Sequence, residues 1–404
     1  MERYGRVAGV FEDDKGFVVI HRSSQINVYF KMKPYKVLHI TNGADVGGIS
    51  NVILNYYKNI DRSQFKFDFV IPPSKLGSNG FELEKLGGTF YTLPEKGAHP
   101  LKFIKELRRL IKNNHYDVVH AHHHSSSYLP LFVALSCGVR CRVAQCHSNM
   151  GDSESIVTKF KRYVGIVLND LSSNLRFACT EEAASHLFGK RLKRLFPVTI
   201  LPNGVEPENF PFSEQARQEA RKDLGIDDKS LVYGMVGRMT SEKNQRYLID
   251  VLPEVLKLRK DAKLLLVGDG PLRNELCEYA KKLGVADKTI LAGKRPDLVN
   301  MLCAMDVFFF FFLYEGSPVS AVEASANGLP IVLSSNITKG LQVLSNVVYV
   351  NINNGSEEQW AKTIVELSTR GRELNSIDNI NNNGFNVCHI AGILADSYLK
   401  VLGV

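Results

Sequence analysis

From Tyr35 onward, short apolar stretches rich in β-branched residues alternate with segments in which apolar residues recur every three or four positions. The first pattern predicts buried strands and the second predicts amphipathic helices. A repeated strand–helix alternation needs crossover connections, which build a parallel sheet covered by helices on both faces. The predicted strands of the first half are residues 35–41, 65–71, 116–122, 142–147 and 175–180.

The alternation pauses at "LPNGVEPENFPFSEQ", residues 201–215, and then restarts. Because 404 residues exceed what one compact core usually holds, we predict an α/β protein of two doubly wound, Rossmann-like domains that face each other across a central cleft. The predicted strands of the second half are residues 230–237, 262–268, 289–293, 307–313 and 330–335. The predicted divisions are 1–31, an N-terminal extension or artificial leader; 32–205 and 206–384, the two domains; and 385–404, a helix that could cross back to the first domain.

Composition narrows the class of protein. No apolar run approaches the roughly 20 residues that cross a bilayer, and the first thirty residues lack the apolar core of a signal peptide, so we expect a cytoplasmic protein. Seven dispersed cysteines indicate reduced thiols. The formal charge of +8 suggests an anionic partner such as a nucleotide or a membrane surface. No nucleic-acid motif is present, and we expect no nucleic-acid partner.

Residues 312–332, "FLYEGSPVSAVEASANGLPIV", carry the strongest chemical signal. Glu315 follows a strand that is apolar on both faces, at the edge where parallel sheets bind ligands. Gly316 lets a ligand approach the backbone, and Ser317 with Pro318 predicts a helix start with a serine cap and proline in the first turn. The backbone N–H groups expected to hold an anion there are those of Ser317, Val319 and Ser320.

Glu323 lies five residues after Pro318, or about 7.5 Å further along a helix axis. That offset suits neutral hydroxyls beside a bound phosphate, such as those of a ribose. We therefore predict that the helix start binds phosphate, Glu323 binds ribose, and Glu315 binds the hydroxyls of a transferred sugar. The alternative is an exposed loop with two solvated glutamates.

The segment "MVGRMTSEKN", residues 235–244, places Arg238 at a strand end and Lys243 five residues later. An arginine and a lysine on one loop can neutralise a leaving diphosphate. Taken alone, the same two residues could be ordinary solvated surface charges.

Two motifs of the first domain are weaker. In "NGADVGGISNVI", Asp45, Gly47 and Gly48 fall between the first strand and its helix, with no full dinucleotide fingerprint. In "VVHAHHHSSS" and "QCHSN", His122 and His147 end neighbouring strands, whereas His120 lies inside one and reads as structural. The imidazoles also permit a metal hypothesis, but the run mixes both faces of a strand, and we predict no metal.

The stretch "EGSPVSAVEASANGLPIV" resembles the E-x7-E signature of retaining glycosyltransferases of family four, which have the GT-B fold. The resemblance extends from about residue 35 to the end and is strongest to bacterial enzymes that build capsular, exopolysaccharide or O-antigen chains. The chain departs from the family at Phe311, Phe312 and Leu313, where a proline and a serine are usual.

The resemblance implies roles for these motifs. Arg238 and Lys243 would bind the diphosphate of a nucleotide-sugar donor, His122 would lie at the reaction centre, and Asp45 and His147 would lie on the acceptor side. The catalytic residues would then be His122, Arg238, Lys243 and Glu315. The donor-binding residues would be Gly47, Gly48, Arg238, Lys243, Gly268, Gly293, Lys294, Glu315, Gly316, Ser317, Pro318, Val319 and Glu323.

The implied activity is hexosyl transfer from a nucleoside-diphosphate sugar, expected to be a UDP-sugar, to a glycan or polyprenyl-linked acceptor in surface polysaccharide synthesis. No cofactor or metal is expected. A nucleotide-sugar epimerase, a phosphorylase and a non-catalytic nucleotide-sugar sensor are the alternatives. The basic and apolar stretch "HLFGKRLKRLF", residues 186–196, could rest on an anionic membrane or be a core helix with a solvated basic face.

Overall fold

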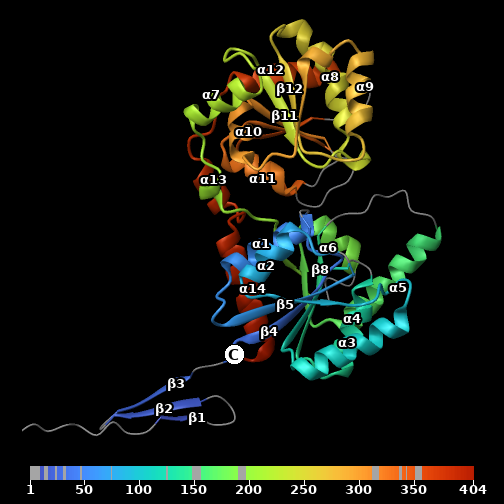
Figure 1. Cartoon of the computed structure of the whole chain (residues 1–404), viewed down its shortest axis with the longest axis vertical. Helices are drawn as coiled ribbons and strands as arrows, with labels where there is room; N and C mark the ends of the chain where they lie inside the picture. The colour runs from blue at the N-terminus through green and yellow to red at the C-terminus, as the bar shows by residue number, and fades with distance from the viewer. Residues whose placement is uncertain are drawn as a thin grey trace, which may run out of the picture.

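The computed structural model describes residues 10–12, 17–22, 25–30, 33–45, 48–73, 75–123, 126–147, 156–189, 197–311, 318–335, 339–342, 344–350 and 357–404. They form two α/β domains, one above the other in Figure 1, and a small separate sheet near the N-terminus. That small sheet is antiparallel, in the region that the sequence pattern left outside the fold. Its strands are β1 (Val10–Glu12), β2 (Phe17–Arg22) and β3 (Gln25–Phe30).

The N-terminal domain is built on a seven-stranded parallel sheet of order β10-β9-β8-β7-β4-β5-β6. The strands are β4 (Tyr35–Ile40), β5 (Phe65–Ile71), β6 (Thr89–Thr92), β7 (Val118–Ala121), β8 (Cys141–Cys146), β9 (Leu175–Ala178) and β10 (Thr199–Ile200). The helices are α1 (Gly48–Asn59), α2 (Ser78–Lys85), α3 (Pro100–Asn114), α4 (Tyr128–Ser136), α5 (Ile156–Ser172) and α6 (Glu181–Phe188).

The C-terminal domain has a six-stranded parallel sheet of order β13-β12-β11-β14-β15-β16. The strands are β11 (Val232–Val236), β12 (Lys263–Val267), β13 (Thr289–Gly293), β14 (Val307–Phe310), β15 (Ile331–Ser334) and β16 (Val347–Val350). The helices of the second half of the chain are α7 (Glu214–Asp223), α8 (Gln245–Leu258), α9 (Arg273–Lys282), α10 (Leu298–Ala304), α11 (Val319–Ala326), α12 (Glu357–Ser368), α13 (Ser376–Asn382) and α14 (Val387–Leu402). Short 3-10 helices are η3 (Pro207–Asn209), η4 (Ser241–Lys243), η5 (Ala286–Lys288) and η6 (Lys339–Leu341).

The predicted fold class of two doubly wound domains is confirmed, because both large sheets are wholly parallel and carry helices on both faces. The side-chain pattern of β5 explains how one strand serves two cores. Phe65, Phe67 and Phe69 point to the face covered by α1, and Val70 points to the face covered by α3. The positions between the phenylalanines hold Lys66 and Asp68, so the sequence of β5 alternates and is not one apolar run.

The last helix, α14, returns to the N-terminal domain and packs beside α1. Its Ile390, Leu394 and Tyr398 side chains belong to the same core as the β5 phenylalanines. The two chain crossings between the domains meet at Val205, which pairs with Asn386. At this junction Gly204 is required, since a Cβ there would lie 2.4 Å from the Ile390 side chain and 2.6 Å from the Phe385 carbonyl oxygen.

Candidate active site

The loop after β11 carries both predicted diphosphate-binding cations. β11 pairs with β14 in the sheet, so the carboxyl ends of these two parallel strands lie side by side at the same edge. Arg238 is exposed, and Lys243 closes the η4 turn with its Nζ 5.7 Å from the centroid of the Phe310 ring. Phe310 is the last residue of β14. The structure therefore brings Lys243 to the strand end from which residues 312–317 begin.

The β11 loop is held in place by the glycine-rich turn after β12. Met239 donates a backbone hydrogen bond to the Asp269 carbonyl oxygen at 3.0 Å, and Gly237 donates one to Val267 at 2.9 Å. A Cβ on Gly268 would lie 2.0 Å from the Gly237 carbonyl oxygen. Gly268 also has a φ of +131°, a conformation that favours glycine. Gly268 thus supports the cation-bearing loop by letting two backbones approach closely.

Two further predicted donor residues follow β13. Gly293 has a φ of +70° and accepts a hydrogen bond from the Gly268 N–H at 2.8 Å, while Lys294 is exposed. The turns after β11, β12 and β13 are therefore linked in series at one edge of the sheet.

Helix α11 begins at Val319, and Pro318 is its cap with a φ of −75° and a ψ of 101°. The expected start, with Pro318 in the first turn, is one residue too early. The extended ψ of Pro318 makes it the flanking residue, while its carbonyl accepts hydrogen bonds from Ala321 and Val322. Of the predicted residues, Glu315, Gly316 and Ser317 lie outside the described residues.

Of the three residues that depart from the family pattern, the structure describes Phe311, while Phe312 and Leu313 lie outside the described residues. Strand β14 ends at Phe310, earlier than the predicted strand. The Phe311 ring stacks on Tyr247 with the centroids 4.2 Å apart and also contacts Trp360. Phe311 is 2% exposed and belongs to the domain core. This side chain consequently packs inward.

Glu323 lies on α11, in its second turn. The residue keeps some exposed surface, but burial of its carboxylate raises the pKa to about 7. Desolvation favours the neutral form, and no positively charged group offsets it in the part of the chain that the structure describes. A carboxylate in this state gains from hydroxyl groups that donate hydrogen bonds to it.

In the N-terminal domain, three histidines form a hydrogen-bonded row. His39 Nδ1 lies 3.0 Å from His122 Nε2, and His122 Nδ1 lies 2.8 Å from His147 Nε2. His39 was not predicted, although it pairs with His120 on the neighbouring strand. All four side chains are at most 6% exposed. Both ring nitrogens of His122 are therefore engaged, and a substrate that bonds to this imidazole has to displace His39 or His147.

Burial disfavours the charged form of three of these imidazoles. Burial lowers the pKa of His39 to about 3 and holds the pKa values of His120 and His122 well below the usual range, with neighbouring histidines adding to the effect. His39, His120 and His122 offer ligand atoms within 4.8 Å of one another, which is metal-site proximity. However, the His122 ring stacks on His39 at 14° and on His120 at 25°. Both ring nitrogens of His122 already contact His39 and His147, so at least one of these contacts would have to break before His122 could bind an ion.

Tyr398 ties α14 to this histidine cluster, because its hydroxyl lies 2.7 Å from His120 Nδ1 in the core. Replacing Tyr398 with phenylalanine should destabilise the N-terminal domain by about 1–3 kcal/mol, since a buried imidazole nitrogen loses its partner. Denaturation followed by circular dichroism measures this loss, with Tyr163→Phe as the control at a 66% exposed tyrosine. If the two variants were equally stable, the contact between the Tyr398 hydroxyl and His120 would not stabilise the domain as proposed.

The first βα loop of the N-terminal domain carries the remaining predicted residues. Gly48 begins α1, and Gly47 lies outside the described residues. Asp45 is exposed and packs on the start of α2, where a Cβ on Gly77 would lie 2.5 Å from its side chain. Asp45 thus fixes this loop against α2.

The two domains approach each other between β16 and α6. Burial raises the pKa of Tyr349 to about 12, and the negative charge of Glu182 on α6 adds to the shift. Figure 1 shows α11 at the end of the C-terminal domain nearest the N-terminal domain, with α1 and α6 opposite. Lys243 and Glu323 belong to the C-terminal domain, whereas the histidine row belongs to the N-terminal domain. The two groups therefore lie on facing domains.

The sequence comparisons bear on this two-domain site. The description "Glycosyltransferase Family 4" matches residues 46–209, and "Glycosyl transferases group 1" matches residues 216–386. A Bacillus subtilis (strain 168) protein named as the glycosyltransferase EpsF is 31% identical over 345 residues, covering 83% of this chain and 88% of its own. The chain belongs to glycosyltransferase family four.

Other relatives of this family-four glycosyltransferase have more specific names. An Escherichia coli UDP-Gal:alpha-D-GlcNAc-diphosphoundecaprenol alpha-1,3-galactosyltransferase is 26% identical over 307 residues, covering 74% of this chain and 79% of the relative. The solved structure of HepE from Anabaena, in complex with UDP and glucose, superposes with a TM-score of 0.74 at 17% identity, covering 90% of this chain and 99% of that one. The predicted family and the GT-B fold are confirmed.

Two observations concern possible contact with a membrane. Among the described residues, every helix is too short or too polar to span a bilayer. Of the basic stretch 186–196, residues 190–196 lie outside the described residues, and residues 186–188 end α6.

Proposed function

We propose that this glycosyltransferase moves a hexosyl unit from a UDP-sugar, with retention at the anomeric carbon, to a glycan or polyprenyl-linked acceptor of a surface polysaccharide. One observation carries the proposal: Lys243 reaches the end of β14, 5.7 Å from the Phe310 ring, so the cationic loop lies at the end of the strand that precedes α11 along the chain. That juxtaposition of cations and a helix start suits a diphosphate.

The proposed chemistry follows from the negative charge that develops on the leaving diphosphate. Breaking the bond between the anomeric carbon and the phosphate oxygen leaves negative charge on the diphosphate. Arg238, Lys243 and the first N–H groups of α11 stabilise that charge without reorganising, which is commonly the largest catalytic effect. The acceptor hydroxyl attacks from the same face, and its proton passes to the departing phosphate oxygen. Protein cations and the helix start thereby do the work of a metal, and the transfer needs no cofactor.

The remaining residues bind the substrates. Glu323 accepts hydrogen bonds from the ribose, and Glu315 accepts them from the transferred sugar. On the facing domain, His122 lies at the reaction centre with Asp45 and His147 on the acceptor side. Two related proteins support the substrate classes: the Escherichia coli relative is named for UDP-Gal and a diphosphoundecaprenol acceptor, and HepE was solved with UDP and glucose.

The ribose assignment predicts a pH dependence. Because the pKa of Glu323 is raised to about 7, the carboxylate is mostly neutral at pH 6 and ionised at pH 8. Donor binding to the wild type should therefore tighten by about tenfold between these pH values. Glu323→Gln should bind the donor weakly and equally at both. Calorimetry with a UDP-sugar, whose diphosphate does not titrate between pH 6 and 8, measures this difference, and a Glu323→Gln variant that keeps the wild-type pH profile would overturn the ribose assignment.

The raised pKa of Glu323 predicts that the stability of the folded protein has the opposite pH dependence. Since the pKa of Glu323 is higher in the folded state than in the unfolded chain, its contribution to stability is fully present below about pH 4.3 and is lost as the pH rises through 7. Donor affinity and stability consequently change in opposite directions over this window.

Product analysis tests the reaction class. The protein is incubated with UDP-sugars with and without a glycan acceptor, and the products are separated by chromatography. Transfer that depends on the acceptor supports the proposal. Conversion of one UDP-sugar into another without any acceptor would identify an epimerase instead.

A further inference from the structure

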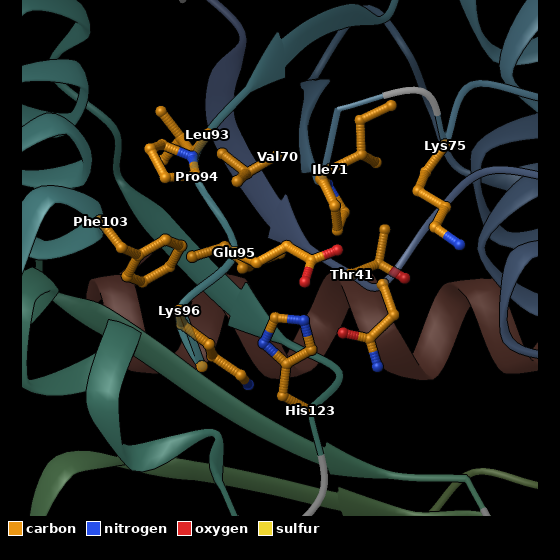
Figure 2. A pocket seen from close by; sticks show the side chains of 14 residues that line it. Thr41, Val70, Ile71, Lys75, Leu93, Pro94, Glu95, Lys96, Phe103 and His123 are labelled. Atoms are coloured by element: carbon orange, nitrogen blue, oxygen red, sulfur yellow. The ribbon is translucent and has the colours of Figure 1, made fainter. Parts of the chain in front are cut away.

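The N-terminal domain has a hollow that none of the assigned residues explains. Its volume is about 320 Å³, and it lies where the carboxyl ends of β4 and β5 meet the segment after β6 and the helix α3. Figure 2 shows Glu95 and His123 pointing into it. Because His123 directly follows His122, the hollow begins beside the histidine row.

Lys96 is the notable group in this hollow. The side chain is half-buried, and its Nζ donates a hydrogen bond to Ser126 Oγ at 2.7 Å. In the described part of the chain, no carboxylate lies within ion-pair distance of this ammonium group. Burial lowers the pKa of Lys96 to about 8. A partly desolvated cation without an anionic partner is costly, and an incoming anion would relieve that cost.

The rest of the lining is mixed. Thr41, Asn42 and Glu95 offer groups that hydrogen-bond to hydroxyls, while Leu93 and Phe103 form an apolar wall. The other titratable or charged groups that line the hollow with Lys96 are Lys75, Glu95 and His123. Lys75 and Glu95 are exposed, so water screens their charges more than that of Lys96. This lining fits a phosphorylated sugar, because Lys96 can bind the phosphoryl group and the neighbouring polar side chains can bind the sugar hydroxyls.

We propose that this hollow binds a phosphoryl group of the acceptor on Lys96, with the adjoining sugar against Glu95 and Thr41. The inference rests on the proposed transferase activity and specifies the class of acceptor. The phosphoryl group could belong to the diphosphate of a polyprenyl-linked acceptor or to a phosphate substituent on a soluble glycan.

Calorimetry with inorganic pyrophosphate tests the site. The background is the Arg238→Ala/Lys243→Ala double variant of the full chain, which removes the donor cations and so separates this test from the donor proposal. Adding Lys96→Gln should weaken pyrophosphate binding about tenfold or more, because a buried charged hydrogen bond is lost. The control is Lys102→Gln, at an exposed lysine of α3. Equal affinity of the two variants would overturn the proposal.

A pH series distinguishes a specific Lys96 contact from a general loss of charge. In the double-variant background, binding should weaken as the pH rises from 7 to 9.5, because Lys96 loses its proton near pH 8. Lys96→Arg should retain binding and remove this pH dependence, since an arginine stays charged. If Lys96→Arg kept the alkaline loss of affinity, another group would be responsible and the proposal would fail. Thermal unfolding of each variant confirms that it folds.

Two further ligands identify the source of the phosphoryl group. Farnesyl diphosphate represents a lipid-linked acceptor, and glucose 1-phosphate represents a phosphorylated sugar. Tighter binding of the first, lost with Lys96→Gln, supports a polyprenyl-linked acceptor. Tighter binding of the second, lost in the same way, supports a phosphorylated glycan. Binding of either ligand that is unaffected by Lys96→Gln contradicts the assignment of this hollow.

Discussion

Replacing Arg238 or Lys243 with alanine is expected to lower the turnover of glycosyl transfer on the order of 100-fold or more. The reason is that each cation stabilises the charge of the departing diphosphate more than that of the bound donor. Lys243 sits at the end of β14, and Arg238 is exposed on the loop after the neighbouring strand. Steady-state kinetics with a UDP-sugar and its acceptor gives the turnover of each variant.

Two control variants test whether the position of the removed positive charge determines the loss of turnover. Arg109→Ala on α3 and Lys260→Ala, beyond the far end of α8 from the β11 loop, each remove one exposed cation of the same type. Both controls should retain turnover within about twofold. Near-normal transfer by both Arg238→Ala and Lys243→Ala would defeat the assignment of these residues to the diphosphate.

Gly268→Ala is expected to destabilise the C-terminal domain by roughly 3 kcal/mol or more. The new methyl group would lie 2.0 Å from the Gly237 carbonyl oxygen, at a φ of +131°. To make room, the β11 loop must move, and the predicted diphosphate site moves with it. UDP binding should therefore weaken even at temperatures where the variant is folded.

The chain offers a direct control and a convenient probe for this effect. Gly284 has a φ of +71° but open space around its Cβ position, so Gly284→Ala should cost only about 1–2 kcal/mol, from backbone strain. Trp360 is the single tryptophan of the sequence and is fully buried in the C-terminal core, so its fluorescence follows unfolding of this domain. Equal destabilisation by the two substitutions would show that the loop contact is unimportant.

Much of the fold was predictable because strand and helix periodicity are local properties. The stretch of residues 65–71, for example, predicts a strand, and β5 occupies Phe65–Ile71. The family was likewise predictable, since the motif around Glu323 is a continuous stretch. Details that depend on one residue's backbone geometry were less accessible, and Pro318 lies before α11 instead of in its first turn.

Contacts between distant segments could not be predicted. His39 lies within an apolar strand, and only the pairing of β4 with β7 brings it to His122, 83 positions away. Lys96 belongs to a loop without any motif, and its bond to Ser126 depends on how that loop packs near the end of β7. For Gly268, the family resemblance implied donor binding, whereas its contact with Gly237 follows from the register of two strands.

The diphosphate site at the edge of β11 and β14 is the central feature of the proposed mechanism, and a comparison of UDP with uridine tests it directly. Calorimetry gives the affinity of both ligands for the wild type and for the Arg238→Ala/Lys243→Ala variant. We expect the wild type to bind UDP far more tightly than uridine, and the double variant to lose most of that preference while binding uridine as before. A double variant that prefers UDP as strongly as the wild type would contradict the account.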